Sequence, residues 1–457
     1  MKKLFSVLSA LTVAGAAYAE VSVDSVTVRQ DWPWSKNINV AVVVSGADAA
    51  GVDLAVNAFD GETPLGEIKC ASLVSGSLLG AKNGTTRFVI DPSKAFAGMD
   101  ARAFGAFRLD VSVKGAADPH LDRVEYIVLD LETGAKTLLS RRDFYSSPDI
   151  YGDIVRDYTT VGDGFKQYID DCFIWTGVNA EEYKTRKLAL KRIPAGGVEW
   201  TMGPSQAEID AGVTKANGYW AHPVMGEGQK LVKISKDYFL AVFELTQEQC
   251  YRLCGRKLSY YTNLTARAKS PIEHEQDDEG SVSPPAVPAL LATHYDFGLK
   301  LPTEAQWEFA ARCGCYDNLL PNGKERTDAN FGELEGYSEK RGHQGRNDLP
   351  TIGGPYLVGD GKPNAYGLWN TLGNVRERTR DNACIQPGSH NHNSTSNPAV
   401  DPTVPGSCLA NNYYAIKGGS FNSLDSRPAA RFANTGGAGF YQNVAQTGWR
   451  LVIEDVE

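Results

Sequence analysis

Near its C-terminus the chain reads Lys417-Gly418-Gly419-Ser420-Phe421, and four other short blocks surround this stretch in a fixed order. Three blocks precede it: LPTEAQWEFAAR at residues 301–312, NAYGLWN at 364–370 and GNVRER at 373–378. The tripeptide GWR follows it at 448–450. The order of the blocks, more than any single one, carries the information about the second half of the chain.

Taken together, these blocks resemble the formylglycine-generating enzyme family, also called the sulfatase-modifying factor family. Two further stretches agree with the family pattern. GGVEWTMG at 196–203 matches its opening strand and turn, and ELTQEQ at 244–249 resembles the entry to its first helix. The resemblance implies that residues 188–457 form an irregular α+β domain related to C-type lectins.

Two helices of this domain can be delimited from their capping residues. Thr246 can accept a hydrogen bond from an exposed backbone N–H at the start of the first helix, and Gly255 can end that helix. Thr303 and Gln306 form a capping box that opens the second helix, which we expect to run through Arg312. The residues of this helix expected to pack inward are Ala305, Phe309 and Ala310.

Residues 1–19 are typical of a secretory signal peptide. Lys2 and Lys3 supply the charged start, residues 4–17 are mostly apolar, and Ala-Tyr-Ala at 17–19 fits a cleavage site. We therefore expect an exported protein whose mature chain begins at Glu20, in the periplasm, at the cell surface or outside the cell. The apolar run is too short to span a bilayer, and no later segment is long enough, so no membrane span is expected.

Length and charge bound the remaining possibilities. A chain of 457 residues predicts two or three domains. A formal net charge of −9 argues against nucleic acid as a partner, because phosphate binding needs a basic surface.

The first domain is expected to be an all-β sandwich, immunoglobulin-like, over residues 20–139. Short runs rich in β-branched residues alternate there with Gly, Asp and Pro turns. We expect residues 140–187 to be a connector that packs against both halves. The predicted fold class is therefore mixed, with this sandwich preceding the α+β domain. The expected strands lie at residues 21–28, 39–44, 53–59, 87–90, 107–113 and 124–131.

The resemblance also indicates where catalytic chemistry should lie. In the family, two cysteines that follow the Gly-Gly-Ser-aromatic run bind copper and react with the substrate thiol. The matching positions here are Ser423 and Pro428, and residues 409–457 contain no cysteine. Neither side chain can form a thiolate, so we expect no copper and no catalytic residue at these positions.

Other candidate metal ligands and cysteine pairs are less specific. His390 and His392 could approach one metal from a loop, but a polar surface loop is the simpler interpretation. The acidic run at 273–279 is expected to be a solvated surface loop. The chain has eight cysteines, and Cys384 with Cys408 is our first choice of a disulfide, although pairing cannot be derived from sequence.

The family's calcium-binding pattern is retained. By resemblance, the ligands of one site are Asn370, the carbonyls of Gly373 and Val375, and Glu377. A second site maps to Asn330 and the carbonyl of Phe331, completed by Asp348. Carboxylate, amide and carbonyl oxygens are what calcium prefers. The alternative is that Glu377 pairs with a neighbouring cation: Arg376, Arg378 or Arg380.

The favoured interpretation is a calcium-stabilised binding or scaffold module without formylglycine-generating activity. Phe421, Arg427 and Arg431 would line a groove for an acidic or sugar ligand, so the partner would be a peptide, a glycan or another envelope component. The alternative is a divergent metal-dependent oxidoreductase of the same family. A third possibility is a structural envelope component that uses both domains as spacers.

Overall fold

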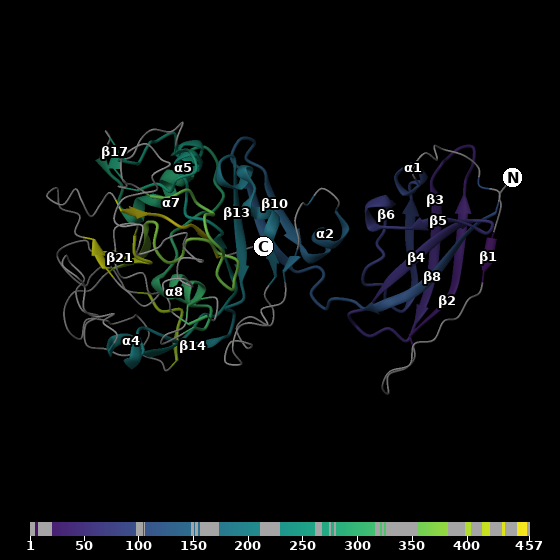
Figure 1. The fold of residues 1–457 in the computed structure, drawn as a ribbon, viewed down its shortest axis with the longest axis horizontal. Helices are drawn as coiled ribbons and strands as arrows, with labels where there is room; N and C mark the ends of the chain where they lie inside the picture. Colours follow the sequence, from purple (N-terminus) through teal and green to yellow (C-terminus); the bar gives the residue numbers. More distant parts are fainter. Residues whose placement is uncertain are drawn as a thin grey trace. The chain divides into compact units, whose positions relative to one another are not determined.

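The fold is described from a computed structural model, in which the chain forms two compact units (Figure 1). The first unit comprises Met1–Glu125 and Leu139–Tyr151, and the second comprises Tyr126–Leu138 and Gly152–Glu457. The structure describes residues 5–7, 21–96, 104, 106–147, 150, 154–155, 173–210, 229–260, 267–273, 276–277, 280–315, 320–321, 324–325, 355–382, 398–403, 414–420, 432–434 and 446–454.

The first unit consists mainly of two antiparallel sheets. One sheet has the strand order β1-β2-β3-β7-β6, and the other has the order β5-β4-β8. The strands are β1 (Phe5–Val7), β2 (Ser22–Gln30), β3 (Ile38–Ser45), β4 (Val52–Asp60), β5 (Thr63–Glu67), β6 (Leu73–Ser75), β7 (Gly84–Ile90) and β8 (Phe107–Ala116). The helical turns are η1 (Cys70–Ser72), α1 (Pro92–Ala95) and α2 (Arg141–Ser146). The strand β1 lies within the expected signal peptide.

Alternating apolar residues produce the core of this unit. Successive side chains of a strand point to opposite faces, so every second residue of β3 and β4 faces inward. The two sheets bury these residues in one shared core with Phe88 and Phe107. The inward residues are Ile38, Val40, Val42 and Val44 of β3, and Val52, Leu54, Val56 and Ala58 of β4.

The strand expected at 124–131 forms, but it does not join these sheets. As β9 (Val124–Asp130) it pairs with β13 (Lys187–Ile193) of the second unit, with Leu190 opposite Ile127. Its residues 125–129 are all buried, so neither face of the strand is exposed to solvent. A strand with one wet face would alternate polar and apolar residues, and residues 126–129 do not. Assigning this strand to the first domain was therefore wrong.

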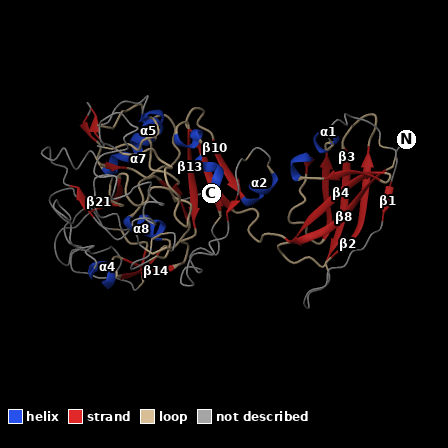
Figure 2. Cartoon of the chain, viewed as in Figure 1, coloured by secondary structure: helices blue, strands red, loops and turns tan. Residues whose placement is uncertain are grey.

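The second unit has several sheets and few helices (Figure 2). Its largest sheets have the strand orders β10-β9-β13-β16-β24, β22-β21-β19-β23 and β14-β15-β20. The further strands are β10 (Lys136–Ser140), β11 (Ile154–Val155), β12 (Ile174–Trp175), β14 (Glu199–Met202), β15 (Lys230–Lys233), β16 (Tyr238–Ala241), β17 (Gln276–Asp277), β18 (Gly280–Ser281), β19 (Arg376–Asn382), β20 (Ala399–Val400), β21 (Tyr414–Lys417), β22 (Phe432–Asn434), β23 (Thr447–Gly448) and β24 (Val452–Ile453). The helical elements are η3 (Thr176–Asn179), η4 (Glu181–Lys184), α4 (Gln206–Asp210), α5 (Gln247–Cys254), η5 (Pro284–Ala286), α7 (Val287–Leu291) and α8 (Glu304–Arg312).

The capping predictions for α5 and α8 are confirmed. Thr246 and Gln249 form a capping box at the start of α5, and Gly255 ends this helix in the left-handed conformation. Thr303 and Gln306 form the capping box of α8. Both helices therefore begin where the sequence predicts, because a cap depends only on neighbours within four residues.

The inward face of α8 is also as predicted. Ala305, Phe309 and Ala310 lie in the main apolar core of the second unit. The Phe309 ring contacts Trp200 edge-on and stacks with Tyr366, at centroid distances of 5.5 Å and 5.9 Å. All nine residues of α8 are buried, so this helix is a central element rather than a surface one.

Glu273, the first residue of the acidic run, is fully buried and accepts a hydrogen bond from the Tyr260 N–H at 2.7 Å. For this residue the expectation of a solvated loop was wrong, because the buried carboxylate is hydrogen-bonded to the backbone of Tyr260.

Among the described residues, no helix is long and apolar enough to cross a membrane.

Candidate functional site

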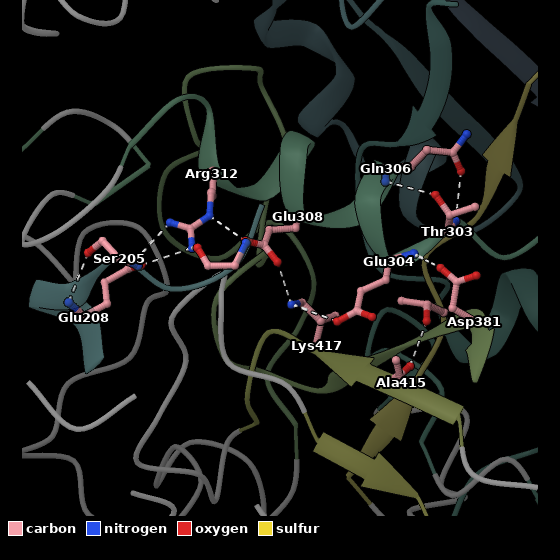
Figure 3. Close-up of polar contacts among 12 residues, drawn as sticks. Ser205, Glu208, Thr303, Glu304, Gln306, Glu308, Arg312, Asp381, Ala415 and Lys417 are labelled. Atoms are coloured by element: carbon pink, nitrogen blue, oxygen red, sulfur yellow. Dashed lines mark hydrogen bonds and ion pairs between the residues drawn. The ribbon is translucent and has the colours of Figure 1, made fainter. Parts of the chain in front are cut away.

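A chain of charged side chains crosses the buried centre of the second unit (Figure 3). Glu304, Glu308 and Arg312 are spaced four residues apart, so they share one face of α8. Lys417 of β21 points between the two carboxylates, with Nζ 2.9 Å from Glu308 Oε2 and 3.5 Å from Glu304 Oε1. Arg312 Nε lies 2.7 Å from Glu308 Oε1, and its Nη1 lies 3.0 Å from Oε1 of Glu208 on α4.

The electrostatics of this network are governed by burial and by the two cations. Burial raises the pKa of Glu308, but the charges of Lys417 and Arg312 outweigh it and hold that pKa at about 2. Glu308 is therefore ionised at neutral pH. Isolated buried charges cost several kcal/mol each, so the network is stable only as a complete set. These contacts give Lys417, the first residue of the Lys-Gly-Gly-Ser-Phe stretch at 417–421, a structural role.

The glycines of that stretch permit close packing against α8. Gly418 has a φ of +89°, a value that favours glycine. A Cβ at this position would lie 3.0 Å from the Trp307 side chain and 3.1 Å from the Thr371 carbonyl oxygen. The stretch therefore lies directly against α8 and against the turn that begins at Asn370.

A second buried ion pair lies beside this turn. Arg450 donates from Nη2 to Glu377 Oε1 at 2.7 Å and from Nε to Glu377 Oε2 at 2.8 Å. The Trp307 indole N–H donates to the same carboxylate. Arg450 also donates to the carbonyls of Val242 and Trp369. The cation that pairs with Glu377 is thus Arg450, and the expected alternatives Arg376, Arg378 and Arg380 were wrong.

A further carboxylate holds the turn from the other side. Glu244 accepts hydrogen bonds from the Val375 backbone N–H at 3.0 Å and from the Asn374 side-chain amide. Burial, together with the charge of Glu377, raises the pKa of Glu244 well above its ordinary value. In the motif ELTQEQ, Glu244 therefore holds the turn at 374–375 by hydrogen bonds, whereas Thr246 caps α5.

The residues of the first expected calcium site lie on this one turn, and the side chains of Asn370 and Glu377 already have partners within the protein. Asn370 has a φ of +56°, and its Oδ1 accepts a hydrogen bond from the Gly359 N–H at 3.0 Å. Gly373, with a φ of +103°, makes the bend between Asn370 and Val375. Both oxygens of Glu377 contact Arg450. The set thus fits a hard cation in part: its oxygen ligands are of the right kind, but Glu377 would share its charge with Arg450.

Other predicted site residues lie outside the described part of the chain. Within that part, no group of three or more His, Cys, Asp or Glu side chains could hold a metal ion. The residues outside are Asn330, Phe331, Asp348, Cys384, His390, His392, Cys408, Phe421, Ser423, Arg427, Pro428 and Arg431.

Two arginines flank Glu377 in the sequence. Arg376 and Arg378 are both on β19, and burial lowers the pKa of Arg376 to about 10. The Arg378 guanidinium lies 5.8 Å from the centre of the Tyr414 ring. An arginine of β19 thus contacts an aromatic ring of the neighbouring strand β21.

Sequence reasoning missed both buried ion networks. The spacing of Glu304, Glu308 and Arg312 was a usable signal, because the other residues of this helix apart from Gln306 are apolar. Charged residues on a buried face need partners. No local signal linked Glu377 to Arg450, since these residues are 73 positions apart.

A family model described as a sulfatase-modifying factor enzyme 1-like domain matches residues 192–455. The chain belongs to this family. The match includes α5, α8, the turn at 370–377 and Arg450, so both buried networks are inside the sulfatase-modifying factor domain.

Individual relatives cover less of the chain. The formylglycine-generating enzyme of Streptomyces coelicolor is 34% identical over 189 residues, which are 38% of this chain and 51% of that protein. The formylglycine-generating enzyme of Thermomonospora curvata is 34% identical over 169 residues, 34% of this chain and 50% of that protein. The chain thus spans about half the length of these curated relatives. A solved structure, Treponema denticola variable protein 1, is 19% identical with a TM-score of 0.37, covering 59% of this chain and 96% of that one.

Proposed function

We propose that this protein is an exported binding or scaffold module of the sulfatase-modifying factor type that does not generate formylglycine. Its first unit would be an immunoglobulin-like sandwich, and its sulfatase-modifying factor domain a C-type-lectin-related fold stabilised by calcium. The observation that carries the proposal is the presence of Ser423 and Pro428 where the resemblance places the two copper-binding thiolates. The ligand would be a peptide, a glycan or another envelope component that contacts Phe421, Arg427 and Arg431.

The contacts of Lys417 and Ser420, in the Lys-Gly-Gly-Ser-Phe stretch, support this proposal. Lys417 is ion-paired with Glu304 and Glu308, and the Ser420 hydroxyl donates to Gln446 Oε1 at 2.7 Å. Both side chains are buried and are used to hold the fold. These two side chains of the stretch are therefore occupied by contacts within the fold.

Export is tested by determining the N-terminus of the native protein. Residues 1–19 have the charge and apolar pattern of a signal peptide, so we expect Glu20 to be the first residue of the mature chain. N-terminal sequencing of protein from the native host measures this directly. Recovery of a chain that still begins at Met1 would contradict export by this route.

The proposal predicts that the purified protein leaves the cysteine of a sulfatase-type peptide unchanged, with or without Cu(I). Soft thiolate ligands hold Cu(I), and neither a serine hydroxyl nor a proline ring replaces them. Mass spectrometry of the peptide detects the loss of sulfur that formylglycine formation requires. The Streptomyces coelicolor relative, assayed in parallel, serves as the positive control. Turnover that is lost on mutating any cysteine of this chain would overturn the proposal.

Calcium binding is tested through thermal stability. The oxygens of Asn370, Gly373, Val375 and Glu377 would hold the ion, which would neutralise charge and tie the turn together. A ligand that binds only the folded state at 100 times its Kd stabilises by about 2.7 kcal/mol. For a domain of this size that corresponds to a rise in melting temperature of roughly 5–10 °C. Differential scanning fluorimetry in millimolar Ca²⁺ and in EDTA measures this difference, and Mg²⁺ should substitute poorly.

The choice of variant matters in this experiment. Glu377→Gln would also remove the partner of Arg450, so its loss of stability would not report on calcium alone. Asn370→Ala leaves that ion pair intact and should abolish most of the calcium-dependent shift. Equal melting temperatures of the unsubstituted protein in EDTA and in Ca²⁺ would exclude calcium from the proposal.

A further inference from the structure

Two cysteine thiols meet at the end of α5. Cys250 and Cys254 are four residues apart on the buried face of this helix, and their sulfur atoms are 3.8 Å apart. Cys254 is the last residue of α5, and Gly255 follows it in the left-handed conformation. The second thiol thus lies at the point where the helix ends, and its backbone is less constrained there than inside the helix.

The surroundings distinguish the two thiols chemically. The Cys250 thiol hydrogen-bonds to the Cys254 sulfur, and this contact outweighs the opposing effect of burial. With the Arg256 N–H and the charges of Arg256 and His294 adding to it, the pKa of Cys254 falls to about 7. Cys254 is therefore partly thiolate at neutral pH, which makes it the nucleophile of the pair. Cys250 is fully buried, whereas Cys254 retains slight exposure.

We propose that Cys250 and Cys254 form a reversible intramolecular disulfide, with a low-molecular-weight disulfide as the oxidant. In the first step the Cys254 thiolate attacks one sulfur of the oxidant, which gives a mixed disulfide and releases one thiolate. In the second step Cys250 loses its proton and attacks the Cys254 sulfur, which releases the second thiolate. The two cysteines lose two electrons, and the oxidant is reduced to two thiols.

The geometry requires only a local adjustment for this reaction. The sulfur atoms must approach from 3.8 Å to about 2.0 Å. Movement of Cys254 alone could bring the sulfur atoms together. The change would be local, because Cys254 lies in the last turn of α5, next to the hydrogen bond from the Gly255 N–H to the Tyr251 carbonyl. The modification thus belongs to the end of one helix and leaves the capping box at Thr246 in place.

The sequence allows a direct test on the full-length protein. Trypsin cleaves after Arg252, so Cys250 is in the peptide 237–252 and Cys254 is in the peptide 253–256. After exposure to oxidised glutathione and alkylation of remaining thiols, we expect these two peptides to be joined by a disulfide, as detected by mass spectrometry. Dithiothreitol should separate them again. Recovery of both as separately alkylated peptides after oxidation would overturn the proposal.

Single variants test the assigned order of the steps. In Cys250→Ser the second step is blocked, so glutathione should remain attached to Cys254. In Cys254→Ser we expect Cys250 to stay unmodified, and preferential glutathionylation of Cys250 would contradict the assigned roles. Cys313 and Cys315 are matched buried controls whose thiols, like that of Cys254, donate to backbone carbonyls. They should remain unmodified in the folded protein, and their oxidation at the same rate would remove the special role of the α5 pair.

Discussion

Replacing Arg450 with methionine is expected to lower the free energy of unfolding of the second unit by about 3–5 kcal/mol. Arg450 is fully buried, and Glu377 is 1% exposed. Methionine fills a similar volume but leaves the Glu377 carboxylate in the interior without its cation. It also leaves the carbonyls of Val242 and Trp369 without the donors that Arg450 provides. The cost is large because a buried charge loses its partner while water cannot replace it.

Urea denaturation followed by tryptophan fluorescence measures this loss, since Trp307 and Trp449 are buried in the same unit. The matched control is Lys300→Met, which removes an ion pair with Glu454. The Lys300 side chain is 43% exposed, so this pair lies at the surface. Such surface pairs contribute at most about 1 kcal/mol. If Arg450→Met and Lys300→Met cost the same, the Glu377–Arg450 pair is not a determinant of stability.

Replacing Lys417 with methionine is expected to have a similar effect with a characteristic pH dependence. The pKa of Glu308 is about 2 in the folded protein, below its ordinary value of 4.5, so the stabilisation is fully present above pH 4.5. It is lost as the pH falls from 4.5 to 2, because the unfolded state then binds a proton that the folded state does not. The shift corresponds to roughly 3 kcal/mol, at 1.36 kcal/mol per pKa unit.

In Lys417→Met, burial of Glu308 is opposed by Arg312 alone, so the pKa of Glu308 rises toward its unfolded value. At pH 7 the variant should be less stable by about 3–5 kcal/mol. This difference should shrink as the pH falls from 4.5 to 2. Urea denaturation across this pH range measures it. Lys233→Met, which alters an exposed pair with Glu199, should show a small and constant difference. A pH-independent difference for Lys417→Met would refute the assigned charge interaction.

Local features of this protein could be predicted from sequence because their causes are local. Thr246 with Gln249 and Thr303 with Gln306 determine where α5 and α8 begin, since each cap involves residues three positions apart. The order of short motifs identified the family of the second unit. The β-branched runs between Gly, Asp and Pro turns likewise predicted the strands β3 and β4 of the first unit.

The tertiary structure decided which distant residues became partners. The strand β9 reads as a good strand in either unit, and only its pairing with β13 assigns it to the second. Glu377 has three arginines within three positions, yet its partner is Arg450, 73 positions away. Likewise, Lys417 has no local carboxylate and pairs with Glu308 across 109 positions. A buried charge must be matched by whichever opposite charge the packed strands and helices bring within contact, and sequence spacing does not contain that information.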